Sequence, residues 1–200
     1  MSELARRAGL ISELGKVFLK TNALRIGEYT KSDGSKTPFY ISLTDIMSFP
    51  NAFSLAVDCM NFKLDEFQTG DQVQSFCGIP VVGLVLGAVI AHERSKPILY
   101  PHREPTHKIA GILKPGTHVL IIDDVSETGV SIEQAAHSIR ANGGVVEKAL
   151  TLIDRGEGAA EALQKMGIEL ESFTTLKELA STLKENLALS EEEAEFVGSG

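Results

Sequence analysis

The chain of 200 residues has no tryptophan, only two cysteines and no long apolar run. Cys59 and Cys77 stand in apolar surroundings and lack the C-x-x-C spacing of a zinc or redox motif, so we predict buried free thiols in a reducing compartment. No apolar stretch reaches the roughly 18 residues that a membrane-spanning helix needs. No signal-type apolar core follows the first ten residues. We therefore expect a cytoplasmic protein that does not contact a membrane.

An excess of positive charge is also missing. The 19 Lys and Arg residues are outnumbered by 27 Asp and Glu residues, which gives a net charge of −8. Because nucleic-acid binding needs clustered Lys and Arg, this balance argues against a nucleic-acid partner but leaves room for a local basic pocket. The chain also lacks the G-x-x-x-x-G-K-[ST] motif of a P-loop. Its apolar content of 43% is enough for a compact domain with a substantial core.

Apolar segments and helix-type patterns alternate along most of the chain. The first 20 residues predict an amphipathic helix, Thr37–Leu43 is rich in strand formers, and Asn51 is a candidate cap for a helix that runs to about Phe67. Further strands are predicted over 73–80, 96–100, 118–123, 145–154 and 168–173, and helices over 83–94, 131–144, 158–167 and 174–187. Such alternation predicts an α/β fold with an open, mostly parallel sheet flanked by helices. Ligands bind such sheets at the carboxyl ends of their strands.

The stretch VLIIDDVSETGVS (119–131) carries the chemistry expected at such a strand end. Four apolar residues run into Asp123 and Asp124, and a polar turn with Thr128, Gly129 and Ser131 follows. Loop amides and a helix N-terminus favour a phosphate there. The two carboxylates would repel a phosphate, so we expect them to face a sugar diol, a magnesium ion or a developing cation. A ribose 5-phosphate group meets both needs.

This stretch resembles the signature of type I phosphoribosyltransferases, which bind phosphoribosyl pyrophosphate (PRPP). The resemblance implies that Asp123 and Asp124 contact the ribose hydroxyls and that the following turn holds the 5-phosphate. The residues that it assigns to PRPP in this segment are Asp123, Asp124, Val125, Ser126, Glu127, Thr128, Gly129, Val130 and Ser131.

Other segments resemble orotate phosphoribosyltransferase, including the type fused into UMP synthase, over roughly residues 24–187. The segment IGEYTKSDGSKTPFYISL, which contains Lys31, is similar to the N-terminal motif of that family. The segment CGIPVVGLVLGAVIA resembles the strand, loop and helix that receive pyrophosphate. ILYPHREPTHK lies where the family has a mobile basic loop, and LIDRGEG resembles the segment whose arginine binds the orotate carboxylate. That arginine is Arg155 here.

The resemblance implies transfer of the phosphoribosyl group from PRPP to orotate, giving orotidine 5′-monophosphate and pyrophosphate in pyrimidine biosynthesis. It implies Mg²⁺ carried by PRPP without a dedicated protein cage, and a homodimer in which the loop reaches the partner's site. Asp123 and Asp124 would share catalysis with the loop residues Arg103 and Lys108, while His107 and Lys31 would also bind PRPP. We expect a single phosphoribosyltransferase domain over 1–190, with 1–45 contributing a hood-like part, 101–113 the mobile basic loop and 191–200 an acidic tail.

Three segments depart from the orotate pattern: the basic loop, the N-terminal motif and the turn after the acid pair. Thr106 stands where the loop has its catalytic lysine and Lys108 where it has a histidine, and Ser32 takes the place of the N-terminal lysine, which is shifted to Lys31. Glu127 replaces a threonine that contacts orotate. Two alternatives follow: a purine-base phosphoribosyltransferase with Glu127 as general acid and base, or a PRPP-binding regulator without catalysis.

Overall fold

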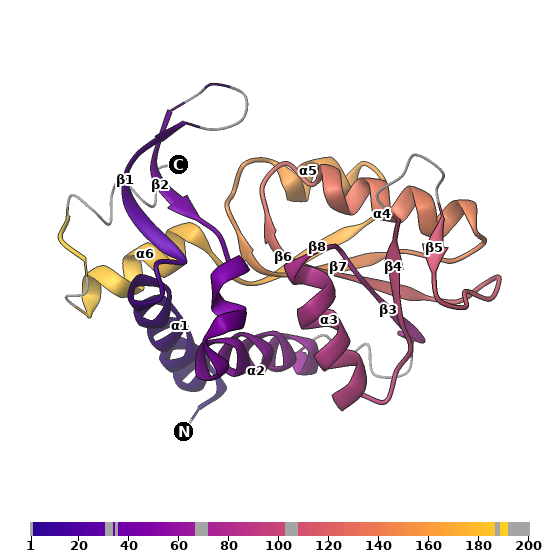
Figure 1. Ribbon diagram of the computed structural model, residues 1–200, viewed down its shortest axis with the longest axis horizontal. Coiled ribbons are helices and arrows are strands. Elements are labelled where there is room, and N and C mark those ends of the chain that lie inside the picture. Colours follow the sequence, from indigo (N-terminus) through magenta and orange to yellow (C-terminus); the bar gives the residue numbers. More distant parts are fainter. Residues whose placement is uncertain are drawn as a thin grey trace. The chain divides into compact units, whose positions relative to one another are not determined.

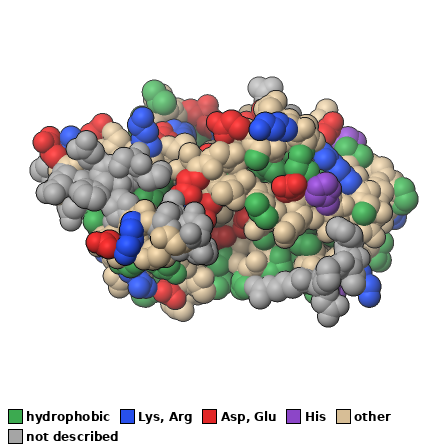
Figure 2. All heavy atoms as spheres, turned by 90° about the horizontal axis from the view of Figure 1, so that it is seen from above, with side chains coloured by type: hydrophobic (Ala, Val, Ile, Leu, Met, Phe, Trp, Pro, Cys, Tyr) green, Lys and Arg blue, Asp and Glu red, His purple; other side chains and the backbone are tan. Residues whose placement is uncertain are grey.

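The computed structural model describes residues 2–30, 34, 36–66, 72–102, 108–186 and 189–191. The chain forms two compact units, one from Met1–Cys59 with Thr174–Gly200 and the other from Met60–Phe173. Among the described helices, none is both long and apolar enough to cross a membrane. On the face drawn in Figure 2, the Lys and Arg side chains of the described residues are scattered among acidic and uncharged ones.

The unit built from the chain ends packs its first helix against its last. α1 buries Ile11, Leu14 and Phe18, which recur at helical spacing on one face. Gly15 lets α6 come close, because a Cβ at this position would lie 2.8 Å from Leu183 Cδ2. The elements of this unit are α1 (Glu3–Lys20), the antiparallel hairpin of β1 (Leu24–Thr30) and β2 (Lys36–Ile41), the 3-10 helix η1 (Thr44–Ser48), the first part of α2 (Pro50–Glu66), and α6 (Leu176–Glu185) (Figure 1).

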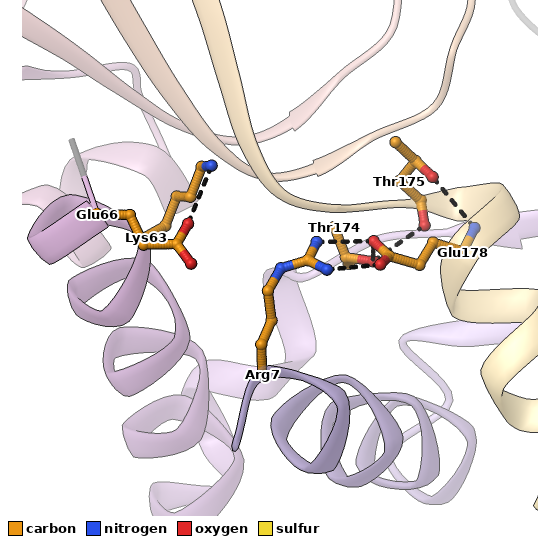
Figure 3. A network of polar contacts seen from close by, with 6 residues as sticks. All are labelled: Arg7, Lys63, Glu66, Thr174, Thr175 and Glu178. Atoms are coloured by element: carbon orange, nitrogen blue, oxygen red, sulfur yellow. Dashed lines mark hydrogen bonds and ion pairs between the residues drawn. The ribbon is translucent and has the colours of Figure 1, made fainter. Parts of the chain in front are cut away.

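A bidentate ion pair also ties α1 to α6 (Figure 3). The two terminal nitrogens of Arg7 donate to the two carboxylate oxygens of Glu178 at 2.6 and 2.8 Å, and Thr174 Oγ1 donates to Glu178 at 2.9 Å. Burial alone would raise the pKa of Glu178, but the hydrogen bonds from Arg7 and Thr174 outweigh burial and lower it. Thr175 caps α6 by accepting a hydrogen bond from the Glu178 N–H at 3.1 Å.

The second unit is built on an open sheet with the strand order β5-β4-β3-β6-β7-β8. β3 pairs in parallel with β4 and β6, β6 pairs in parallel with β7, and β5 runs antiparallel to β4 at the edge. The strands are β3 (Ser75–Gly78), β4 (Ile98–Pro101), β5 (Ile109–Ala110), β6 (Val119–Ser126), β7 (Lys148–Asp154) and β8 (Glu169–Thr175). The helices between them are α3 (Val82–Glu93), α4 (Val130–Ala141) and α5 (Ala159–Gln164).

Helices cover both faces of this sheet (Figure 1). Ile121 of β6 belongs to the buried cluster that contains Ile132 and Ala136 of α4. The next residue, Ile122, faces the other way, where its Cβ lies 3.4 Å from the position that a Cβ on Gly87 of α3 would take. Burial on both faces explains why the first half of β6 is apolar without alternation.

The end of α2 packs on β8 within the same unit. Lys63 Nζ lies 3.1 Å from carboxylate oxygens of both Glu66, drawn in Figure 3, and Glu171. Burial alone would lower the pKa of Lys63, but the hydrogen bonds with these two carboxylates outweigh it and raise the pKa. Phe62 and Phe173 meet edge to face, with ring centroids 6.3 Å apart.

The α/β class and the order of the main elements agree with the sequence predictions. Four details differ. α2 begins at Pro50, so Asn51 lies inside the helix and is not its cap. β1 was not predicted, and β5 lies within the stretch expected to be loop. β6 continues through both acids to Ser126, because this part of the strand still pairs with β7.

Candidate active site

The acid pair lies near the carboxyl end of β6. Asp123 is buried, with 7% of its surface exposed, and its Oδ1 accepts a hydrogen bond from the Asp124 N–H at 2.9 Å. Burial, together with the charge of Asp124, raises the pKa of Asp123 well above its ordinary value. Burial also raises the pKa of Asp124. The pair is therefore poised to bind a group that favours its ionised form, such as a hydroxyl donor or a cation.

The N-terminus of α3 lies against the same acids. The Ile79 N–H donates to the Ile122 carbonyl at 2.9 Å, which holds the end of β3 beside β6. Gly83 has no side chain to separate α3 from β6, since a Cβ there would lie 2.8 Å from Asp123 Cα. α3 has no side-chain cap at Val81. The Leu84 N–H donates to the Ile79 carbonyl at 2.8 Å, which leaves the amides of Val82 and Gly83 as the candidates for an anion next to the acid pair.

The turn after β6 surrounds a pocket of about 140 Å³. Gly129 has φ 82° and ends the turn, and α4 starts at Val130 without a side-chain cap. A positive φ favours glycine, and the uncapped helix start exposes amides to the pocket. The residues that line the pocket are Asp123, Val125, Ser126, Glu127, Thr128, Gly129, Val130, Ser131 and Ile132. This set includes all the predicted PRPP residues of the segment except Asp124.

Ser126 lines the pocket, but its hydroxyl is engaged inside the protein. Ser126 Oγ donates to Asp154 Oδ1 at 2.9 Å, and Asp154 Oδ1 also accepts from the Gly156 N–H at 3.2 Å. The Arg155 N–H in turn donates to the Ser126 carbonyl at 2.9 Å. These bonds extend the parallel register of β6 and β7 beyond the sheet, and they hold the turn after β7 beside the pocket.

Arg155 lies between two carboxylates at this edge. Its Nη1 is 2.5 Å from Glu127 Oε1, and its Nη2 is 2.7 Å from Glu157 Oε1. The Arg155 side chain is only 6% exposed, whereas that of Glu127 is 52% exposed and lines the pocket. Sequence reasoning identified Arg155 and Glu127 separately but missed both their pairing and Glu157. The only sequence signal for Glu157 is its position two residues after Arg155.

The predicted basic residues are only partly described. Lys31, Arg103 and His107 lie outside the described residues. Lys108 is exposed, and its carbonyl accepts a hydrogen bond from the His102 N–H at 2.9 Å. The antiparallel pairing of β4 with β5 continues this contact. Within the predicted loop 101–113, His102 and Lys108 are thus held together at the edge of the sheet.

Asp123 and Asp124 also provide the donor type that Mg²⁺ prefers. Carboxylate oxygens are hard ligands, and Mg²⁺ is commonly held by one or two carboxylates together with substrate phosphates. In the described parts of the chain, no three or more His, Cys, Asp and Glu side chains gather into a metal-binding group. The acid pair therefore fits a magnesium ion that arrives with a phosphorylated substrate.

Comparison with known proteins defines the family. No family model matches the chain. It is 30% identical over 187 residues to the orotate phosphoribosyltransferase of Staphylothermus marinus, covering 92% of this chain and 90% of that protein. It is 32% identical over 176 residues to that of Methanocaldococcus jannaschii, covering 86% and 97%. The chain belongs to the orotate phosphoribosyltransferase family.

Solved structures agree with this assignment. The orotate phosphoribosyltransferase of Aeropyrum pernix matches with a TM-score of 0.76 and 31% identity, covering 88% of this chain and 99% of that one. The UMP synthase of Leishmania donovani matches with a TM-score of 0.84 and 28% identity, covering 94% of this chain and 41% of that one. The orotate phosphoribosyltransferase of Mycobacterium tuberculosis in complex with PRPP matches with a TM-score of 0.65 and 26% identity, covering 85% and 98%. The predicted family and fold class are confirmed.

Proposed function

We propose that this member of the orotate phosphoribosyltransferase family transfers the phosphoribosyl group of PRPP to orotate, giving orotidine 5′-monophosphate and pyrophosphate in de novo pyrimidine biosynthesis. The observation that carries the proposal is the pocket after β6, where Asp123 lies beside the turn Glu127–Gly129 and the uncapped start of α4. One pocket thus offers the Asp123 carboxylate for a sugar diol and amides for a phosphate.

Each part of the site has a role in this reaction. Asp123 and Asp124 accept hydrogen bonds from the ribose hydroxyls, and their charges favour the positive character that develops at the anomeric carbon. The turn and the first amides of α4 hold the 5-phosphate. The first amides of α3 face the leaving pyrophosphate, beside the acid pair. Arg155 binds the orotate carboxylate and so orients the attacking ring nitrogen.

The remaining parts of the proposal concern the metal, the loop and the assembly. Asp123 and Asp124 would hold Mg²⁺ that arrives with PRPP, and the ion would supply charge neutralisation for the leaving pyrophosphate. Arg103, His107, Lys108 and Lys31 are proposed as further cationic donors to PRPP. The free thiols Cys59 and Cys77 suit a reducing compartment, and the enzyme is proposed to be cytoplasmic. From the resemblance to the family, it is also proposed to be a homodimer in which the loop completes the partner's site.

The deciding experiment is a turnover assay with PRPP and magnesium against orotate, uracil, hypoxanthine, guanine and adenine. We expect consumption of orotate alone. The Asp124→Asn variant should lose about 10- to 150-fold in kcat/KM, the equivalent of a hydrogen bond to a charged group. Turnover of a purine in place of orotate would support the acid and base role of Glu127, and PRPP binding with no turnover would support a regulator. Near-normal turnover in Asp124→Asn would refute the site.

A further inference from the structure

Two carboxylates, Glu127 and Glu157, flank Arg155 and differ in their surroundings. Both contact Arg155, whose side chain is only 6% exposed. The side chain of Glu157 is 18% exposed, so it is largely enclosed by protein. The side chain of Glu127 is 52% exposed and lines the pocket. The Glu157 carboxylate is therefore a fixed part of the site, whereas the Glu127 carboxylate can turn into solvent.

The strand register explains why Glu127 meets Arg155. Ser126 and Asp154 are partners in the parallel pairing of β6 with β7, so the next residue of each strand leaves the sheet beside the other. The Arg155 N–H donates to the Ser126 carbonyl and fixes this arrangement. The backbone pairing of β6 with β7 therefore places residues 127 and 155 side by side. A substitution of the Glu127 side chain leaves this pairing in place.

The charges oppose an acceptor that carries a carboxylate. One guanidinium and two carboxylates give this group a net charge of −1. Two like charges about 4 Å apart repel by roughly 4 kcal/mol at a surface-like dielectric constant. If Glu127 turns into solvent, Arg155 and Glu157 remain as a neutral pair, and Nη1 of Arg155 is released for another carboxylate.

We propose that the Glu127 carboxylate occupies Arg155 in the absence of substrate, and that the orotate carboxylate binds Arg155 by displacing it. The inference rests on the proposed function. Binding then exchanges one carboxylate for another on the same guanidinium nitrogen. The apparent affinity for any acceptor with a carboxylate is therefore proportional to the fraction of molecules in which Glu127 has left Arg155. Glu127 is thus a specificity-determining residue that weakens the binding of a carboxylate-bearing ligand relative to the same ligand without the carboxylate.

The test compares two nucleotides that differ only in the carboxylate, orotidine 5′-monophosphate and UMP, by calorimetry. Both carry the 5-phosphate that the turn binds, so both affinities are measurable without turnover. In Glu127→Gln, the affinity for orotidine 5′-monophosphate relative to that for UMP should rise about 10-fold, which is about 1.4 kcal/mol. Any effect of the lost charge on the 5-phosphate is common to both nucleotides and cancels in this ratio. Glu127→Thr, with a shorter uncharged side chain, should behave in the same way.

Glu157→Gln is the matched control, since it removes the same charge from the other side of Arg155 and leaves Glu127 in place. Its affinity for orotidine 5′-monophosphate should be unchanged or weaker. Equal tightening in Glu127→Gln and Glu157→Gln would show a general charge effect and overturn the proposal. Unchanged or weaker binding of orotidine 5′-monophosphate relative to UMP in both Glu127 variants would also overturn it. Melting temperatures of all variants check that each is folded.

These outcomes separate the inference from the function on which it rests. In one outcome, the wild-type enzyme converts orotate while the Glu127 variants leave the ratio of the two nucleotide affinities unchanged. This result would overturn the displacement of Glu127 by orotate but not the proposed function. A wild-type enzyme that is inactive with orotate but active with a purine overturns the proposed function, whatever the nucleotide affinities are.

Discussion

At the scale of single residues, the acid pair favours substrate binding at the expense of stability. Asp123 is buried next to Asp124, and burial and the neighbouring charge raise its pKa well above the ordinary value. A carboxyl with a raised pKa holds its proton in the folded state at a pH where the unfolded chain has lost it. The free energy of unfolding therefore falls as the pH rises from the ordinary aspartate range, near 4, through the raised pKa.

The Asp123→Asn variant tests this balance. Without ligand at pH 8, it should melt at a higher temperature than the wild type, by about 2–4 °C for each kcal/mol gained. It should also lose most of the decline in stability between acid and alkaline pH. Thermal unfolding across that range, followed by circular dichroism, measures both effects.

The same substitution should lower kcat/KM about 10- to 150-fold, because it removes a charged acceptor from the ribose. Asp58→Asn, on the exposed side of α2, is a control for the loss of one negative charge and should change stability by less than about 0.5 kcal/mol. A lower melting temperature for Asp123→Asn than for the wild type at pH 8 would show that the buried carboxylate stabilises the fold.

At the scale of elements, the close approach of α3 to β6 places helix amides beside the acid pair. Gly83 and Gly87 lie one turn apart on α3 and both face the sheet, but they differ in free space. A Cβ on Gly83 would meet Asp123 Cα, Asp123 Oδ1 and the Ile122 carbonyl at 2.8 Å. A Cβ on Gly87 would meet its nearest neighbours, the side chains of Ile122 and Ile98, at 3.4 Å.

The two alanine substitutions should therefore have different effects. Gly83→Ala forces backbone apart and should cost about 1–3 kcal/mol of stability. It should also raise the KM for PRPP by about 10-fold or more, because it moves α3 away from the acids. Gly87→Ala gains helix propensity of up to about 1 kcal/mol and should be neutral or stabilising. Urea unfolding and PRPP titration of each variant measure these effects. Equal losses in both would show that the position of α3 is not critical.

The elements also show what the sequence could and could not predict. Buried strands such as β6 and periodic helices such as α1 were predictable, because apolar pattern determines them. β5 has two residues, too few to carry a pattern. The extent of β6 depends on pairing with β7, which a single strand does not reveal. The pairing of Glu127 with Arg155 joins positions 28 apart, so it follows only once the strand order is known.

At the scale of the whole molecule, both ends of the chain fold into one unit and the middle into the other. The Arg7–Glu178 pair and the packing of Gly15 against Leu183 join α1 to α6 within the unit of the chain ends. The pocket after β6 lies entirely in the other unit. The boundaries expected for a single domain, a hood-like part and an acidic tail stay predictions.

The proposed shared loop makes a prediction about the assembly. Light scattering should give a dimer. Asp123→Asn impairs a site but leaves its loop intact, whereas the combined variant Arg103→Ala, His107→Ala and Lys108→Ala impairs the loop but leaves its site intact. If each loop serves the partner's site, a mixed dimer contains one complete site, formed by the intact acid pair of one protomer and the intact loop of the other.

Mixing equal amounts of the two impaired proteins, under conditions that exchange subunits, should therefore restore about a quarter of the wild-type activity, because half of the dimers are mixed and each has one complete site. The two proteins kept apart should stay impaired. If the loop instead serves its own protomer, each chain in the mixed dimer keeps its own defect, and mixing restores nothing. Chemical cross-linking of the dimers before mixing is the control, since it prevents exchange and should abolish the recovery.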